Sequence, residues 1–375
     1  MHMTRTRTAL VSLATLSIVV AGCGALGGGG SDKAKTATSA EEMGGMDALV
    51  SAAKAEGKLN VIALPRDWAN YGEILDGFSK KYGITIDEQQ PDANSQQEID
   101  AANSTKGTDR APDVFDLGAA VALANTGIYA PYKVAAFADV PAGLKDATGL
   151  WVSDYAGYMS IGCDTKKVPL PATVKDLLKP EYKGMVALNG DPTKAAAGMN
   201  GVEMASLANG GSADDIMPGI EFFKQLNDLG NLLPVDPTPA TIASGQTPCV
   251  IDWQYNNAAQ DNADNQAKGI DFKTVVPSDA PPVASFYIQA INKDAPHPAA
   301  ARLWEEYLYS PDGQNAWLRG AAHPVLEAKM IADGTIDKAA LDKLGTSTQT
   351  PVVLNQDQLK KAQDALTANW TITIQ

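Results

Sequence analysis

The sequence predicts an α/β protein with open, mostly parallel sheets. Two observations support this fold class: short apolar segments alternate with segments of helical periodicity, and glycine, proline or asparagine stands at most junctions. The chain has 375 residues, of which 45% are hydrophobic and 20% are charged. This composition excludes a disordered chain, and the length is sufficient for two or three domains.

Six short apolar segments predict the strands of these sheets. The first ends at Pro65 and the second begins after Gly83, because both residues interrupt regular structure. Their continuous apolar character is typical of strands that are buried on both faces. The expected strands cover residues 59–64, 84–86, 113–117, 185–188, 248–253 and 286–291.

Helices are predicted between the strands. Asn70 with Glu73 three residues later resembles a capping box, so a helix is expected to begin there and to end at Gly83. Pro298 suits the first turn of a later helix, where its missing N–H costs nothing. The other expected helices cover 119–127, 194–207, a polar segment from 256, and 298–309.

Residues 1–22 predict a lipoprotein signal peptide. Arg5 and Arg7 precede a low-polarity run over 9–21, which has the length of a signal h-region and is short for a membrane span. The run ends in VAGC, which resembles the lipobox of bacterial lipoproteins, so Cys23 is expected to carry a lipid. The alternative is an ordinary signal peptide with a chance cysteine. Residues 23–50 are expected to form a flexible tether that anchors an extracytoplasmic body to the cell membrane.

The charge balance and the few cysteines and histidines exclude several classes of protein. Lys and Arg number 30 against 44 Asp and Glu, a formal charge of -14, which argues against nucleic-acid binding. With three cysteines and three histidines, the chain has too few residues of these types for a typical Cys/His zinc site, and no resident metal is expected. If Cys23 carries lipid, an oxidising compartment favours a disulfide between Cys163 and Cys249 over two free thiols.

Several motifs resemble those of extracellular solute-binding proteins of ABC importers. They are WANY at 68–71, KYGI at 81–84, APDV at 111–114, LLKPEYKG at 177–184, and HPAAAR with LYSPDGQ between 297 and 314. The HPAAAR and LYSPDGQ segments are similar to segments of the group that binds iron, polyamines or aminoethylphosphonate. The resemblance implies a two-lobe periplasmic-binding-protein fold of the type II kind with two crossing hinge strands. It also implies a monomer without a cofactor.

This resemblance predicts the division of the chain into lobes. Lobe one is expected to comprise 58–155 plus 285–325, and lobe two 160–275. The crossing strands are expected at 151–164 and near 275–291. Residues 326–375 are expected to form C-terminal helices.

Ligand contacts are expected where strands end, because open α/β sheets bind ligands at the carboxyl ends of their strands. The candidate ligand-binding residues are Asp67, Trp68, Tyr71, Asp116, Thr193, Asp252, Trp253, Tyr255 and Tyr287. Aromatic faces and carboxylates together suit an ammonium group, so an amine-bearing solute such as a polyamine or aminoethylphosphonate is favoured. Trp253 and Tyr255 are alternatively core residues.

Other ligands and functions remain as alternatives. Ferric binders of the group that these motifs resemble carry two adjacent tyrosines just after the strand expected here at 248–253. In this chain Tyr255 is the single tyrosine at that place, and Tyr287 is the only candidate for the second ligand. A phosphonate or phosphate would use Thr193, helix N-termini and Arg66. Enzyme activity is not expected, because no nucleophile elbow, HExxH or Walker motif is present and the one GxGxxG match, at 22–27, follows no strand. The implied partners are an ABC permease and its ATPase subunits, with a sensor as the alternative.

Overall fold

The computed structural model describes residues 29–344 and 350–374. Cys23 and the predicted signal peptide lie outside the described residues. The strands are β1 (Lys58–Ile62), β2 (Thr85–Gln89), β3 (Val114–Gly118), β4 (Tyr129–Ala130), β5 (Val152–Asp164), β6 (Val186–Leu188), β7 (Cys249–Trp253), β8 (Phe272–Val275), β9 (Ala284–Asn292) and β10 (His323–Pro324). All six predicted strands are present, with ends that differ by at most three residues.

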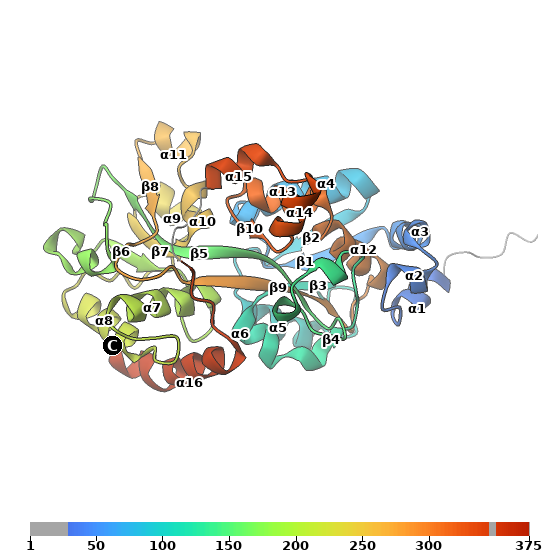
Figure 1. Ribbon diagram of the computed structural model, residues 1–375, viewed down its shortest axis with the longest axis horizontal. Coiled ribbons are helices and arrows are strands. Elements are labelled where there is room, and N and C mark those ends of the chain that lie inside the picture. The colour runs from blue at the N-terminus through green and yellow to red at the C-terminus, as the bar shows by residue number, and fades with distance from the viewer. Residues whose placement is uncertain (1–28, 345–349, 375) are drawn as a thin grey trace, which may run out of the picture.

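Helices surround these strands, as the alternating pattern predicts (Figure 1). None of the described helices combines the length and the apolar content needed to cross a bilayer. The helices are α1 (Gly29–Ala34), α2 (Ala40–Met43), α3 (Met46–Glu56), α4 (Tyr71–Tyr82), α5 (Ser95–Thr105), α6 (Ala119–Ala124), α7 (Ala196–Ala208), α8 (Met217–Asp228), α9 (Pro239–Ala243), α10 (Gln254–Ala259), α11 (Ala263–Ala267), α12 (Pro298–Leu308), α13 (Pro311–Arg319), α14 (Glu327–Asp333), α15 (Lys338–Leu344) and α16 (Gln356–Thr373).

Strand β5 joins two lobes. Its first part pairs with β9, with Ala156 opposite Phe286, and its second part pairs with β7, with Cys163 opposite Cys249. The central strand order is β3-β9-β5-β7-β6, so the strands of both lobes form one continuous hydrogen-bonded path through β5. In Figure 1, β5 and β9 run side by side through the middle of the molecule.

The prediction of mostly parallel sheets is wrong. Only β1 with β2 and β6 with β7 pair in parallel among the named strands of the described chain, whereas every named pair that includes β5 or β9 is antiparallel. The reason is that β5 and β9 pass from one lobe into the other, and each meets its neighbours in the opposite direction. Periodicity detects buried strands but carries no information on this direction.

The predicted capping box at Asn70 is also wrong. Asn70 has a left-handed backbone (φ 67°), and its side chain does not cap the helix. Its amide instead donates to Glu73 Oε2 at 2.7 Å and to the carbonyl oxygen of Ala316 at 2.9 Å. Asn70 therefore ties the start of α4 to α13, and the helix begins at Tyr71 without a side-chain cap.

The chain from Gly29 to residue 50 does not have the tether structure that was expected. It forms α1, α2 and the start of α3, which pack against α12 at the far end of lobe one (Figure 1). Arg302 of α12 is buried and donates from Nε to the carbonyl oxygen of Ala37 at 2.8 Å. Ala34, Ala37 and Met43 are buried as well. The composition of this segment predicts a flexible tether, but its small apolar residues are packed at an interface with lobe one.

The C-terminal segment divides between the lobes. Helix α15 packs against α13 in lobe one. Val352 then pairs with Val283 beside the start of β9, where its N–H donates to the carbonyl oxygen of Pro282 at 2.8 Å. Helix α16 packs against α7 and α8 of lobe two and also reaches α6 of lobe one. The chain therefore passes between the lobes at β5, at β9 and again before α16.

The predicted disulfide is confirmed. Cys163 and Cys249 lie directly opposite each other in the β5–β7 pair and are bonded. Both residues are fully buried. The bond holds the strand that ends in Asp252 and Trp253 against the strand that crosses between the lobes.

Candidate functional site

A cavity of about 380 Å³ lies between the two lobes. Lobe one lines it with the loop around Asp67, the start of α5 and Asp116 of β3, and lobe two with residues 195–197 and Asp252 of β7. Its volume is near the lower end of the range for small-molecule sites. The cavity therefore lies where the ends of strands from both lobes meet, as the sequence predicts.

Close contact between the lobes closes one edge of this cavity. A Cβ atom added to Gly118 would lie 2.3 Å from the Cβ of Ala196, so no larger residue fits between β3 and the start of α7. Ala195, Ala196 and Ala197 all line the cavity. Small residues on both sides thus allow the two backbones to approach, which encloses the space behind them.

Helix α5 forms part of the lobe-one wall and was not predicted. Asn94 caps it, and Asn94 and Gln97 form a reciprocal capping box. The cap orients the first turn, from which Ser95 Oγ accepts the N–H of Gly118 at 3.0 Å and Glu98 Oε2 accepts the N–H of Asp116 at 3.3 Å. The N-x-x-Q pattern at 94–97 was available in the sequence and would have located both the helix and Glu98.

The cavity is strongly acidic. Six carboxylates line it and no Lys, Arg or His does, among the described residues. These carboxylates are Asp67, Asp92, Glu98, Asp116, Asp236 and Asp252. Burial raises the pKa of Asp116 and of Asp252 to about 7, and it raises the pKa of Glu98 well above its usual value. A cation in the cavity would oppose each of these shifts.

Asp116 is only partly satisfied by hydrogen bonds. Its Oδ2 accepts the hydroxyl groups of Tyr71 at 2.9 Å and Tyr155 at 3.0 Å. Its Oδ1 is buried and has no hydrogen-bond partner. Asp116 as a residue is 6% exposed and lines the cavity, so a ligand in the cavity meets a carboxyl group whose hydrogen-bonding capacity is only partly used.

Asp252 occupies the corresponding place in lobe two. Its Oδ1 accepts the N–H of Trp253 at 2.6 Å, and its Oδ2 accepts the side-chain amide of Asn256 at 3.0 Å. Nearby, Asp236 Oδ1 accepts the N–H of Gly190 at 2.8 Å. Both oxygens of Asp252 therefore have partners within the lobe.

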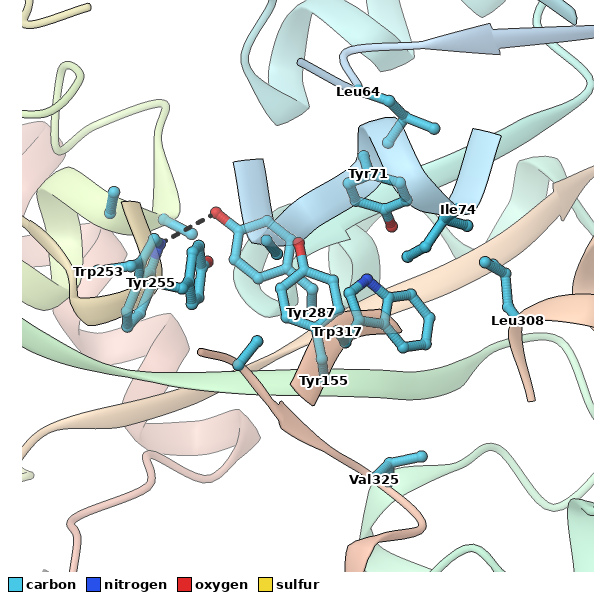
Figure 2. Close-up of a cluster of buried hydrophobic side chains, with 14 of the residues drawn as sticks. Leu64, Tyr71, Ile74, Tyr155, Trp253, Tyr255, Tyr287, Leu308, Trp317 and Val325 are labelled. Carbon is cyan, nitrogen blue, oxygen red and sulfur yellow. Dashed lines mark hydrogen bonds between the residues drawn. The ribbon is translucent and has the colours of Figure 1, made fainter. Parts of the chain in front are cut away.

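A mostly buried aromatic cluster packs around the crossing strands β5 and β9 (Figure 2) and reaches the cavity through Trp68 and Tyr287. We call it the hinge cluster, and it comprises Trp68, Tyr71, Tyr155, Trp253, Tyr255, Tyr287 and Trp317. The rings of Tyr155 and Tyr287 stack with centroids 5.4 Å apart and an interplanar angle of 2°. Trp253 Nε1 donates to Tyr287 Oη at 3.3 Å, as Figure 2 shows.

The predicted site residues fall into three groups. Five line the cavity, namely Asp67, Trp68, Asp116, Asp252 and Tyr287. Tyr71, Trp253 and Tyr255 are at most 1% exposed and lie in the hinge cluster; for Trp253 and Tyr255 this is the core position that the sequence left open. Thr193 does not line the cavity, and its hydroxyl donates to Asp191 at 2.7 Å. The structure therefore brings together the aspartates and two of the aromatic residues.

The described residues contain no metal site built from His, Cys, Asp or Glu. No group of three or more His, Cys, Asp or Glu within 29–344 and 350–374 has the geometry to hold an ion. Burial and nearby carboxyl groups hold the pKa of Tyr255 and of Tyr287 well above 10. A tyrosinate ligand would therefore be costly to form at either position.

Comparisons with known proteins extend over most of the chain. A family model described as "Bacterial extracellular solute-binding protein" matches residues 111–362. No curated protein sequence matches significantly.

Many solved structures share the fold. The binding protein AgtB from A. tumefaciens R10, in complex with agropinic acid, has a TM-score of 0.65 and 17% identity over 85% of this chain and 98% of its own. The apo ferric ion-binding protein A of Pasteurella haemolytica has a TM-score of 0.61 and 19% identity over 85% and 98%. AfuA from Actinobacillus pleuropneumoniae, with bound fructose-6-phosphate, has a TM-score of 0.60 and 16% identity over 85% and 98%. These likenesses confirm the predicted two-lobe periplasmic-binding-protein fold.

Proposed function

The chain belongs to the bacterial extracellular solute-binding protein family, and on this premise we propose that it captures a small amine-bearing organic cation between its lobes. Family membership makes it the solute-binding component of an ABC transporter and a non-enzymatic binder. Its implied partners are the permease and ATPase of that transporter.

One observation carries the proposal: the cavity is lined by six carboxylates and by no Lys, Arg or His of the described chain. An anionic solute would place its charge among these carboxylates without a cationic partner. Binding sites for phosphate and carboxylate normally supply arginine, lysine or a row of N–H donors. A positively charged solute instead relieves the repulsion between the carboxylates and offers donors to their oxygens.

The aromatic residues of the cavity support the same ligand class. Trp68 and Tyr287 reach the cavity, and their rings meet edge to face with centroids 5.7 Å apart. Such rings give apolar contact for methylene groups and attract a cation by about 0.5–2 kcal/mol. An aliphatic amine matches this combination of acidic and aromatic surface.

The other ligands find less support. Aminoethylphosphonate, fructose-6-phosphate and agropinic acid all carry an anionic group, for which the described cavity has no cationic side chain. For ferric ion, the described residues hold no group of three or more His, Cys, Asp or Glu that could form a site, and the raised pKa values of Tyr255 and Tyr287 disfavour tyrosinate ligands. The structural neighbours bind different solutes, and at 16–19% identity they support the fold and not the ligand.

A ligand screen tests the proposal. Protein lacking residues 1–23 is heated with putrescine, spermidine, choline, aminoethylphosphonate, fructose-6-phosphate or ferric citrate. A ligand at 100 times its dissociation constant adds about 2.7 kcal/mol of stability. We expect stabilisation by amines that lack an anionic group, and calorimetry then measures the affinity. Stabilisation by fructose-6-phosphate or ferric citrate alone would refute the proposal.

We further propose that a lipid on Cys23 holds the protein at the membrane. The VAGC segment at 20–23 supports this, since the small residues before the cysteine suit a lipoprotein signal peptidase. Labelling cells with a fatty-acid analogue should mark the wild-type protein and leave the Cys23→Ala variant unlabelled. Label that persists on the variant would contradict the anchor.

A further inference from the structure

We propose that Glu98 and Asp116 form an ammonium subsite in lobe one, at which the bound ammonium group displaces a proton that the two carboxyl groups hold in the free protein. The inference rests on the proposed function, and it adds which residues contact the positive charge and what the protein exchanges for it.

Geometry places the two carboxyl groups together at the cavity. Glu98 is 1% exposed and Asp116 is 6% exposed, and both line the cavity. Glu98 Oε2 accepts the backbone N–H of Asp116 at 3.3 Å, so the side chain of Glu98 lies against the strand that carries Asp116. Asp116 Oδ1 is buried without a partner, and an ammonium group has the N–H donors that this oxygen lacks.

No cation of the described chain compensates the pair. Three carboxyl groups are near enough for the charge of Asp116 to raise their pKa values, namely Glu98 of α5, Asp154 of β5 and Glu305 of α12. Its charge also raises the pKa values of five phenols, of which Tyr71 and Tyr155 donate to it and Tyr287, Tyr255 and Tyr309 do not. Two buried carboxylates that adjoin one another and no cation cannot both stay ionised at low cost.

The direction of the pKa shifts agrees with this geometry. Burial raises the pKa of Asp116 to about 7, despite the hydrogen bonds from Tyr71 and Tyr155 that lower it. Burial and the neighbouring Asp116 raise the pKa of Glu98 well above its usual value. The free protein therefore holds at least part of a proton on the pair at neutral pH.

The exchange is a simple proton transfer without redox change. The O–H bond of the protonated carboxyl group breaks, and the proton passes to water or buffer. An N–H of the ammonium group then donates to the carboxylate oxygen that the proton has left. Aliphatic amines have pKa values near that of lysine, about 10.4, so the ligand keeps its own protons throughout.

This exchange links affinity to pH. Below pH 7 the ligand must compete with protons for the pair, so affinity should fall about tenfold per pH unit for each proton displaced. Above pH 7 Asp116 is largely ionised before the ligand binds, so its contribution to this dependence should weaken. Acidification should therefore weaken ligand binding.

Calorimetric titration with putrescine in two buffers measures the exchange directly. Phosphate and Tris differ in ionisation enthalpy, so the difference in observed heat at one pH counts the protons released. We expect at least about half a proton per ligand at pH 7, and more at pH 6. Glu98→Gln keeps an acceptor for the N–H of Asp116, and it should at least halve the proton count and weaken putrescine binding about tenfold.

Asp100→Asn is the matched control. Asp100 lies on the same helix, is exposed and accepts the side-chain amide of Gln96 at 3.0 Å, so its removal should change neither the proton count nor the affinity. Denaturant unfolding of all three proteins verifies that they are equally folded. Putrescine binding with no dependence on buffer, and with Glu98→Gln unchanged, would overturn the exchange and leave the proposed function standing. Failure of every amine to bind would overturn both.

Discussion

Asp116 and Asp252 face the same cavity from different lobes, and they differ in how their oxygens are used. Both oxygens of Asp252 accept hydrogen bonds from residues of its own lobe. Asp116 has two phenols on one oxygen and nothing on the other. The lobe-two carboxylate is complete before a ligand arrives, whereas the lobe-one carboxylate is not. Direct recognition is therefore expected from lobe one, with lobe two contributing charge and shape.

The two lobes also differ in how their tryptophans of the hinge cluster are used, because only the one from lobe one reaches the cavity. Trp253 of lobe two is fully buried, and Trp68 of lobe one is half-buried and lines the cavity. Trp253→Ala should cost about 3–5 kcal/mol of unfolding free energy, as deletion of a large core ring does. Denaturant midpoints measure the loss. A smaller loss for Trp253→Ala than for Trp68→Ala would reverse the assignment of core and cavity.

Lobe two is also held by a covalent bond for which the described part of lobe one has no counterpart. The disulfide closes an 86-residue separation, and loss of such a bond typically costs about 2–4 kcal/mol. Replacing both cysteines by alanine should lower the unfolding free energy by that amount and leave Asp116 in place. The free-thiol titration of the unfolded, non-reduced protein should find no reactive Cys163 or Cys249. Two reactive thiols would contradict the bond.

Acid should stabilise the ligand-free protein between pH 4 and 7. Burial raises the pKa of Asp116 and of Asp252 to about 7 in the folded state, against about 3.9 for an unfolded aspartate. The folded protein thus binds more protons than the unfolded chain in this window, so its stability falls as pH rises. Each group contributes a slope of up to about 1.4 kcal/mol per pH unit.

Variants of the two carboxyl groups distinguish the contribution of each lobe to the pH dependence of the unfolding free energy. Asp116→Asn and Asp252→Asn should each flatten the fall of unfolding free energy between pH 5 and 7, since each removes one titrating group. Urea unfolding at several pH values measures the slope. A slope of the opposite sign in the wild-type protein would show that these carboxyl groups remain ionised in the fold.

The affinity of these two variants for an amine tests whether lobe one contributes more to recognition than lobe two. Asp116→Asn should weaken amine binding roughly 10- to 100-fold, because it removes a charge-assisted hydrogen bond. Asp252→Asn should weaken it only a few-fold, since its oxygens already have partners in lobe two. Calorimetric titration of both variants with the same amine gives the ratio. Equal losses would mean that the two walls contribute alike.

The sequence predicts the strands because they depend on local apolar patterns, the two lobes because its motifs resemble those of a known family, and the disulfide because only Cys163 and Cys249 remain beside Cys23. It identifies Asp116 and Asp252 because they lie near the carboxyl ends of buried strands. It does not separate Trp253 from Trp68, since Trp253 ends a strand and Trp68 lies shortly after one, and only tertiary packing decides which ring is buried. A Cβ on Gly157 of β5 would lie 2.4 Å from the Tyr255 ring, which shows how closely that packing depends on distant residues. The proposed ligand preference rests on six carboxylates that come from both lobes, and no local sequence pattern brings them together.

The three passages of the chain between the lobes have a consequence for how motion can be observed. An odd number of passages leaves the described chain with its beginning on one lobe and its end on the other. Helix α1 lies beside α3 and α12 at one end of the molecule, and Trp370 of α16 packs on Phe223 of α8 near the other, with ring centroids 5.5 Å apart (Figure 1). A hinge rotation that moved one lobe away from the other would change the distance between these ends. Fluorophores attached there would report such a rotation by energy transfer while leaving the cavity untouched.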